Sequence, residues 1–247
     1  MYERSDTSYR SHWFCVKKKN GALRLVHDLQ PLNAITIWNS GIPPIPDQAI
    51  ESMAGRACYS MLDLFVGYDH RILDELSRDL TTVQSPIGAV RLTCLPQGWT
   101  GAGAIFHGDI VFILEAEILD KAIPFMDDSG IKGPATHYET EDGGYETIPA
   151  NSQIRRFIWE HLNDVHRILH HFLCAGATIS TKKLFIAVLE ITFPRHKCNY
   201  EGHTPDDTKV NKICNWPGCK NLSDVCAFLC YGLFRSIVLS LLIQTYP

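Results

Sequence analysis

The sequence lacks a long uncharged run of apolar residues. The nearest candidate, residues 225–243, is interrupted by Arg235 and by small or polar residues, so no membrane span is expected. An excess of basic residues is also missing, because 23 Lys and Arg face 27 Asp and Glu, which gives a formal net charge of −4. The chain as a whole therefore does not have the composition of a basic nucleic-acid binder.

No Cys-x-x-Cys pair occurs among the nine cysteines. Several late cysteines lie near His196 and His203, but their spacing matches no standard zinc module, so we interpret them as structural thiols. No secretory signal peptide is recognisable ahead of them. We therefore expect free, mostly buried thiols in a reducing compartment, which is the cytoplasm or nucleus, and a protein that is not secreted and has no membrane partner.

The length and charge pattern of the chain show what it can build. Its 247 residues, 45% of them hydrophobic, suffice for one large domain or two subdomains. Residues 1–24 and 181–220 are basic, whereas residues 115–146 carry nine acidic residues against two lysines. Such a distribution suits a protein that binds phosphates at its ends and cations in its middle, although ordinary surface charge gives the same asymmetry.

An acidic turn lies in the middle of the chain. In residues 122–130, AIPFMDDSG, an apolar run is followed by Asp127 and Asp128 and then by Ser129 and Gly130, which predicts a β-hairpin. Adjacent carboxylates repel each other unless a cation neutralises them, and a divalent metal with oxygen ligands is the natural candidate. A solvated turn is the alternative, because Asp is a common turn residue.

A second acidic residue sits in an apolar setting. Residues 57–65, ACYSMLDLF, are predicted to form a buried strand that places Asp63 between Leu62 and Leu64. A buried carboxylate is costly unless it is paired or binds a metal. Asp63 is therefore the candidate partner of Asp127 and Asp128.

A basic hairpin is predicted near the N-terminus. Residues 13–16 and 22–26 read as strands joined by KKKNG, in which Asn20-Gly21 is a strong turn signal. The lysines either solubilise this loop or form a flap that closes over phosphates, with Lys18 and Arg24 as phosphate ligands.

Apolar periodicity places the remaining elements. Helices are expected at residues 47–53, 101–119 and 151–175, the last capped by Asn151 or Ser152 and ended by Gly176, with surface histidines along it. Residues 41–46 read as a stiff extended linker, 134–151 as an acidic surface loop and 184–191 as a strand. Another helix is expected to start at residues 204–207.

Six ordered sequence blocks carry a family resemblance. They read LVHDLQPLN, LDLFVGYDHR, RDLTT, SPIGAVRLTCLPQGWTGAGAIFHGDI, PFMDDSGIKGP and HRILHHFLCAGATISTKK. In this order and with this spacing they resemble the polymerase motifs of reverse transcriptases, above all those of gypsy-type long-terminal-repeat retrotransposon polyproteins. The resemblance extends over roughly residues 13–229.

The resemblance implies an α+β chain with a right-hand polymerase fold, whose ferredoxin-like antiparallel palm sheet packs on helices. It implies fingers at residues 1–41 and 71–101, with palm at residues 42–70 and 102–200 and a loop insertion at 131–153. Residues 201–247 would form a partial thumb with an aberrant C-terminal tail.

The resemblance also implies roles for individual residues. The catalytic triad would be Asp63, Asp127 and Asp128, and these residues with Leu64 would bind two Mg²⁺ ions, or Mn²⁺ in their place. The nucleotide would contact Lys18, Arg24, Tyr68, Gln97 and Lys183, with Tyr68 closing against the sugar 2′ position and Lys183 near the leaving pyrophosphate. A core aromatic and a helix-start hydrogen bond are the alternatives for Tyr68 and Gln97. The primer grip would comprise Phe193, Arg195 and His196.

The implied function is RNA-directed DNA polymerisation by two-metal catalysis. Its partners would be an RNA or DNA template with a primer and deoxynucleoside triphosphates. The chain departs from the family pattern at Gly101 and Gly103, at Pro194-Arg195 and beyond residue 228. The alternative is therefore a catalytically inactive retroelement relic, a fragment or degenerate copy, with at most weak nucleic-acid binding.

Overall fold

The computed structural model describes residues 2–18, 21–37 and 45–232. The chain divides into two compact units. The first comprises Met1–Ile45, Ser60–Ile131 and Leu162–Ile186, and the second comprises Pro46–Tyr59, Lys132–His161 and Ala187–Pro247. The predicted linker at residues 41–46 and the C-terminal tail lie largely outside the described residues. The predicted subdomain boundaries stay a prediction.

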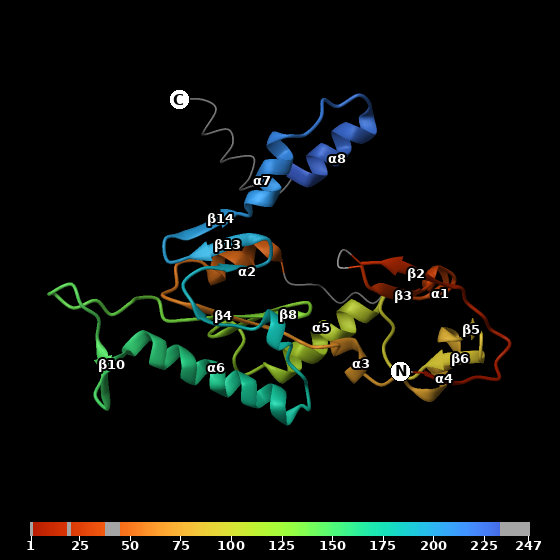
Figure 1. Cartoon of the computed structure of the whole chain (residues 1–247), viewed down its shortest axis with the longest axis horizontal. Coiled ribbons are helices and arrows are strands. Elements are labelled where there is room, and N and C mark those ends of the chain that lie inside the picture. The colour runs from red at the N-terminus through yellow and green to blue at the C-terminus, as the bar shows by residue number, and fades with distance from the viewer. Residues whose placement is uncertain (1, 19–20, 38–44, 233–247) are drawn as a thin grey trace. The chain divides into compact units, whose positions relative to one another are not determined.

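A four-stranded sheet lies beside the predicted acidic residues. Its strands run in the order β11 (Phe185–Val188), β4 (Tyr59–Asp63), β8 (Asp128–Lys132), β7 (Ala122–Phe125). Two of these strands, β4 and β8, are labelled in Figure 1. β7 and β8 pair antiparallel and form a tight hairpin in which Phe125 lies opposite Asp128. The predicted hairpin and the predicted buried strand are therefore both confirmed.

The core of the first unit lies between this sheet and two helices. α5 (Ala102–Ile113) and α6 (Arg156–Cys174) supply buried side chains such as Ile110 and Ile168, which pack with Leu62 of β4. α5 ends six residues before the predicted end at 119. Leu114 forms its C-cap and Leu119 adopts a positive φ of 70°, so the chain turns there into β7.

The other elements of the first unit form two smaller sheets and short helices. β2 (Trp13–Lys17) and β3 (Leu23–His27) form the predicted hairpin, which is followed by α1 (Gln30–Ile35). β1, β6 and β5 form a three-stranded sheet. The bounds are β1 (Tyr2–Arg4), β5 (Val83–Ser85), β6 (Gly88–Leu92), α3 (Gly67–His70), α4 (Glu75–Arg78), and the 3₁₀ helices η1 (Asp79–Thr81) and η2 (Thr181–Lys183).

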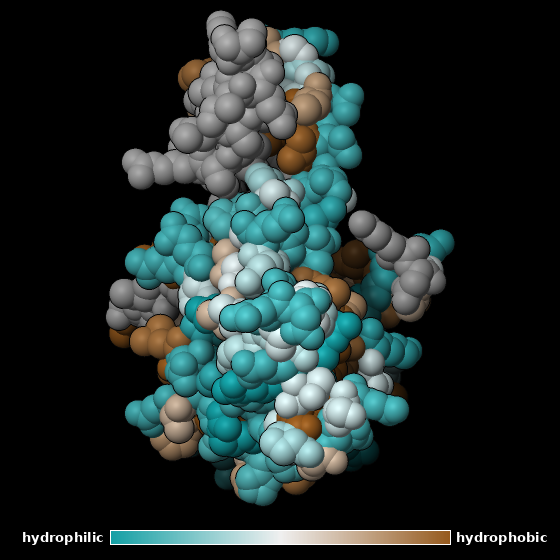
Figure 2. Space-filling model, turned by 90° about the vertical axis from the view of Figure 1, so that its left-hand side faces the viewer, coloured by the Kyte–Doolittle hydropathy of each residue, from teal (hydrophilic) through white to brown (hydrophobic). Residues whose placement is uncertain are grey.

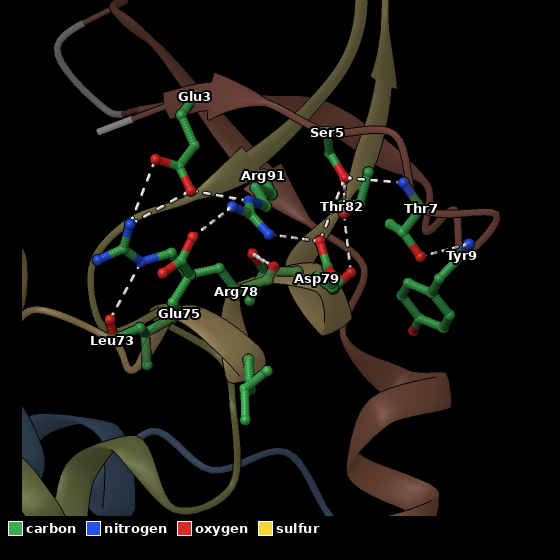
Figure 3. Close-up of polar contacts among 12 residues, drawn as sticks. Glu3, Ser5, Thr7, Tyr9, Leu73, Glu75, Arg78, Asp79, Thr82 and Arg91 are labelled. Carbon is green, nitrogen blue, oxygen red and sulfur yellow. Dashed lines mark hydrogen bonds and ion pairs between the residues drawn. The ribbon is translucent and has the colours of Figure 1, made fainter.

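An ion-pair network holds the N-terminal strand β1 to its sheet (Figure 3). Arg91 of β6 donates to Glu3 at 2.7 Å and to Asp79 at 2.6 Å, and Arg78 also donates to Glu3, at 3.2 Å. Burial works against ionisation, but the hydrogen bonds from Arg78 and Arg91 lower the pKa of Glu3 overall. Glu3 is thereby joined to Arg78 and Arg91, which lie 75 and 88 positions away in the sequence.

The second unit is built from short elements. It contains α2 (Pro46–Met53), the hairpin of β9 (Thr147–Ile148) and β10 (Asn151–Arg155), and the sheet β12-β13-β14. The remaining bounds are β12 (Ile191–Thr192), β13 (His196–Asn199), β14 (Gly202–Pro205), α7 (Asp207–Cys214) and α8 (Leu222–Gly232).

The predicted acidic loop is a folded insertion. β9 and β10 pair antiparallel, so the predicted helix start at residue 151 is wrong and α6 begins at Arg156. Arg156 donates to Glu146 at 2.7 Å and to Glu160 at 2.8 Å, while Tyr138 donates to Glu160 at 2.7 Å. These contacts join the insertion to the first turns of α6.

The predicted helix start at residues 204–207 is confirmed, since α7 begins at Asp207 with Asp206 as its cap and residues 202–205 pair with β13. Two smaller expectations are wrong. His161 is fully buried rather than on the surface. Five of the described free cysteines are exposed, so the thiols are not mostly buried: Cys15, Cys174, Cys214, Cys219, Cys226.

Within the described part of the chain, no helix is long and apolar enough to cross a bilayer. The face in Figure 2 is mostly hydrophilic, with hydrophobic side chains scattered over it.

Candidate active site

The last residue of β4 and the turn between β7 and β8 bring the three aspartates toward one another. Asp63 is the last residue of β4 and is 5% exposed. Asp127 and Asp128 follow Met126, whose positive φ of 56° makes the sharp turn between β7 and β8. The backbone N–H of Leu64 points to the carbonyl of Asp127 at 3.5 Å, which links the two strand ends.

The electrostatics of Asp128 show that the three carboxylates act on one another. Burial and the negative charges of Asp127 and Asp63 raise the pKa of Asp128 to about 6, although Lys183 works in the opposite direction. A carboxyl group with this pKa shares its surroundings with other anions and has lost part of its hydration. Perturbed carboxylates of this kind gather at functional sites.

Lys183 neutralises the most buried of these carboxylates. Its Nζ donates to Asp63 Oδ2 at 2.6 Å. The hydrogen bond to Asp63, together with the charges of Asp63, Asp128 and Asp127, raises the pKa of Lys183. Lys183, which was predicted to contact the nucleotide, thus lies beside the aspartates.

The donor set suits a hard cation, because carboxylate and main-chain oxygens are the ligands that Mg²⁺ prefers. The arrangement is not closed around an ion, however. Among the described residues, no group of three or more His, Cys, Asp or Glu side chains is placed to hold one metal ion. Asp63, Leu64, Asp127 and Asp128 as metal ligands, and Mg²⁺ or Mn²⁺ as the metal, stay predictions.

A pocket of about 360 Å³ gathers three of the predicted nucleotide contacts. Arg24 of β3 donates to the side-chain oxygen of Gln97, and Tyr68 of α3 also lines the pocket. Lys18 lies instead at the tip of the β2–β3 hairpin, where it is exposed. The pocket is lined by Arg24, Tyr68, Gln97, Gly98, Trp99, Ala102 and Gly103.

Tyr68 is held from behind by an aromatic ring. Its ring stacks on Phe106 of α5 with centroids 4.6 Å apart. A Cβ atom at Gly67 would clash with the Phe106 ring, so the backbone before Tyr68 passes directly over that ring. Burial and the charge of Asp127 raise the pKa of Tyr68, which ties this residue to the acidic site.

Trp99 is a pocket residue that the sequence reasoning missed. Its ring lies so close to Gly101 that a Cβ there would approach it to 2.7 Å. Its indole N–H donates to Thr36 at 3.0 Å, which joins the start of α5 to the end of α1. The signal in the sequence was an aromatic residue directly after the LPQG run.

The predicted primer-grip residues form a tight turn in the second unit. Phe193 and His196 exchange backbone hydrogen bonds, at 2.7 and 3.4 Å, around Pro194 and Arg195. Pro194 occupies a corner of this turn, where no N–H is needed for strand pairing. Arg195 has a positive φ of 70°, and Phe193 and His196 are buried. Their role toward a primer stays a prediction.

The curated relatives of the chain are transposon polyproteins. It is 25% identical over 223 residues to the retrovirus-related Pol polyprotein from transposon 412 of Drosophila melanogaster, and 24% identical over 214 residues to the transposon Tf2-3 polyprotein of Schizosaccharomyces pombe. These matches cover 88% and 87% of the chain but only 16% and 14% of the relatives. The chain thus spans about a sixth of their length. No family model matches it.

Solved structures with a similar fold are reverse transcriptases. The foamy viral protease-reverse transcriptase in complex with double-stranded DNA matches with a TM-score of 0.78 and 19% identity, over 95% of this chain and 37% of that one. The same viral protein in complex with an RNA/DNA hybrid matches with a TM-score of 0.72 and 19% identity, over 95% and 28%. The predicted α+β class and right-hand polymerase fold are confirmed. The chain therefore has the reverse transcriptase fold, and its homologues are retrotransposon polyproteins, as the ordered motifs predicted.

Proposed function

We propose that this chain is an RNA-directed DNA polymerase domain that adds deoxynucleotides to a primer under the direction of a template. The observation that carries the proposal is the convergence of Asp63, at the end of β4, with Asp127 and Asp128, at the turn from β7 into β8, within a reverse transcriptase fold. The relatives are polyproteins, so the proposal concerns this part of such a protein.

Divalent metal would bind at these carboxylates. Asp63, Asp127, Asp128 and the main chain of Leu64 would hold Mg²⁺ or Mn²⁺, which would supply charge neutralisation and an activated primer hydroxyl during in-line displacement. The raised pKa of Asp128 supports this assignment, because a bound cation would relieve the repulsion among the three anions.

The pocket beside Tyr68 would take the incoming deoxynucleoside triphosphate. Arg24 would bind its phosphates, and Gln97 would position Arg24 through their hydrogen bond. Tyr68, supported by Phe106, would exclude a 2′-hydroxyl. A template paired with a primer is the proposed partner, and the foamy viral protein of the same fold is known with double-stranded DNA and with an RNA/DNA hybrid.

A catalytically inactive relic is the second candidate. It is favoured by two observations, namely that no described group of three acidic, His or Cys side chains is placed to hold a metal and that Lys183 occupies Asp63. In that case the chain would bind nucleic acid weakly or not at all.

Primer extension distinguishes the two candidates. The chain is incubated with an RNA template, a DNA primer, deoxynucleotides and Mg²⁺, beside the variant Asp127→Asn and the exposed-site control Lys182→Met. We expect extension by the unmutated chain and by the control, with a loss of at least about a hundredfold in Asp127→Asn. A folded unmutated chain that extends no primer with either Mg²⁺ or Mn²⁺ would exclude the polymerase.

A further inference from the structure

The ion pair between Lys183 and Asp63 joins an exposed side chain to a buried one. The Asp63 side chain is 7% exposed, whereas the Lys183 side chain is 63% exposed and reaches in from the surface. Asp63 also lies deeper than Asp127 or Asp128. The carboxylate that is most costly to leave without a counter-charge is therefore the one that the lysine neutralises.

The backbone places Lys183 for this contact. The N–H of Ser180 donates to the carbonyl of Asp63 at 2.8 Å, and the N–H of Phe65 donates to the carbonyl of Thr178 at 2.8 Å. The η2 turn then closes when the N–H of Lys183 donates to Ser180 at 3.2 Å. The segment that carries the lysine is thus fixed to the end of β4, and the ion pair is part of the fold.

The ammonium group of Lys183 interacts electrostatically with all three carboxylates. Asp63 binds it directly, and the charges of Asp128 and Asp127 also act on it. The ammonium lies 2.6 Å from Asp63 Oδ2, where it takes up a lone pair that a divalent metal could use and repels a metal bound to the same carboxylate. The two occupants therefore compete for Asp63.

We propose that Lys183 is an internal counter-ion of the metal-free site, which a divalent metal must displace from Asp63 in order to bind. This inference rests on the proposed function, since the metal is the one assigned there. Lys183 opposes metal binding while it keeps the three aspartates together without metal. The predicted position of Lys183 near the leaving pyrophosphate is a separate role.

Calorimetric titration with Mn²⁺ alone, without nucleotide or nucleic acid, tests the competition in the intact chain. The variant Lys183→Met removes the ammonium and keeps the aliphatic side chain. Lys182→Met is the matched control, because Lys182 is an exposed lysine of the same 3₁₀ turn. We expect Lys183→Met to bind Mn²⁺ roughly three- to tenfold more tightly than the unmutated chain, and Lys182→Met to stay within about twofold of it.

The outcomes separate this inference from the proposed function. Equal affinity of Lys183→Met and the unmutated chain, with binding lost in Asp63→Asn, overturns the counter-ion and leaves the metal site standing. An equal gain in both lysine variants also overturns it, because general charge would then explain the effect. If no folded variant binds Mn²⁺, or if Asp63→Asn binds as well as the unmutated chain, the proposed metal site fails and the inference fails with it. Lys183→Gln provides a second test should Lys183→Met not fold.

Discussion

At the scale of single residues, the turn at Arg195 stores backbone strain. A side chain at a positive φ costs free energy that glycine does not pay, and Arg195 has a φ of 70°. We expect Arg195→Gly to raise the free energy of unfolding by about 0.5–1 kcal/mol, after allowing for the greater freedom of glycine in the unfolded chain. Urea denaturation measures the change. Arg195→Ala is the control and should give no gain, so an equal gain in both variants would point to the lost charge instead.

Asp128 gives a second prediction at this scale. Its pKa is raised from 3.8 to about 6, so the metal-free fold favours the protonated form and loses stability when Asp128 ionises as the pH rises through that range. We expect Asp128→Asn to stabilise the metal-free chain by about 1–2 kcal/mol at pH 7, with the gain vanishing below pH 4. Thermal unfolding across pH 3–8 in the presence of a chelator checks this. A gain that is equally large at pH 3 would show a cause other than ionisation.

Single residues also show how much of the candidate site can be predicted from the sequence. Asp63, Asp127 and Asp128 stand out locally, because each is an acid next to an apolar run, and the strands that carry them were predicted correctly. The contact between Asp63 and Lys183 joins residues 120 positions apart. No local pattern encodes such a pair, and only the family resemblance placed Lys183 near the site.

At the scale of elements, an ion-pair cluster in which an exposed arginine holds two buried carboxylates ties α6 to the connection before β7. Arg167 of α6 holds both carboxylate oxygens of Glu117, one of them at 2.8 Å, and also donates to Asp164 at 2.8 Å. The backbone carbonyl of Glu117 accepts from Ala122, the first residue of β7. The first residue of the hairpin that carries Asp127 is therefore hydrogen-bonded to a residue that α6 holds in place.

This cluster predicts a pH-dependent loss of stability. The hydrogen bond from Arg167 lowers the pKa of Glu117 below its usual 4.5, so the stabilisation is present above that pH and is lost as the pH falls through the lowered value. We expect Arg167→Gln to cost about 1–3 kcal/mol at pH 7, because the buried Glu117 loses its arginine and is left with the 3.6 Å contact to His171. Unfolding measured at pH 7 and pH 3 tests this, and the cost should shrink at pH 3. The double variant with Glu117→Gln should recover part of the loss at pH 7.

The element boundaries that sequence reasoning placed wrongly have tertiary causes. α6 was predicted from residue 151 because Asn151 and Ser152 are good helix caps. Pairing with β9 takes these residues instead, and Arg156 fixes the true start through Glu146 and Glu160. The helix expected to start at 204–207 likewise starts only at Asp207, because residues 202–205 pair with β13. Partners distant in sequence decided both boundaries.

At the scale of the whole molecule, the cysteines provide a test of the fold that is independent of activity. Cys58, Cys94 and Cys198 are buried, and burial raises the pKa of Cys58 to about 12 and that of Cys198 to about 11. A thiol that is both buried and protonated reacts slowly. We expect maleimide at pH 7.5 to label these three at least roughly tenfold more slowly than the exposed cysteines Cys15, Cys174, Cys214, Cys219 and Cys226.

Peptide mass spectrometry of labelled chain reads this pattern. The difference between the two groups should disappear in urea, which serves as the control. Rapid labelling of Cys58 or Cys94 in the native chain would contradict the packing of the unit that contains it.

The stack of Tyr68 on Phe106, with Gly67 directly before Tyr68 in the chain, constrains how related sequences can diverge. A side chain at position 67 would collide with the ring at position 106, so position 67 cannot gain a side chain while position 106 keeps its large ring. Alignments of homologues should therefore show paired substitution: an alanine or serine at the position of Gly67 should occur together with a smaller residue at that of Phe106. The support of Tyr68, which lines the pocket, would in this way be inherited as a correlated pair of positions.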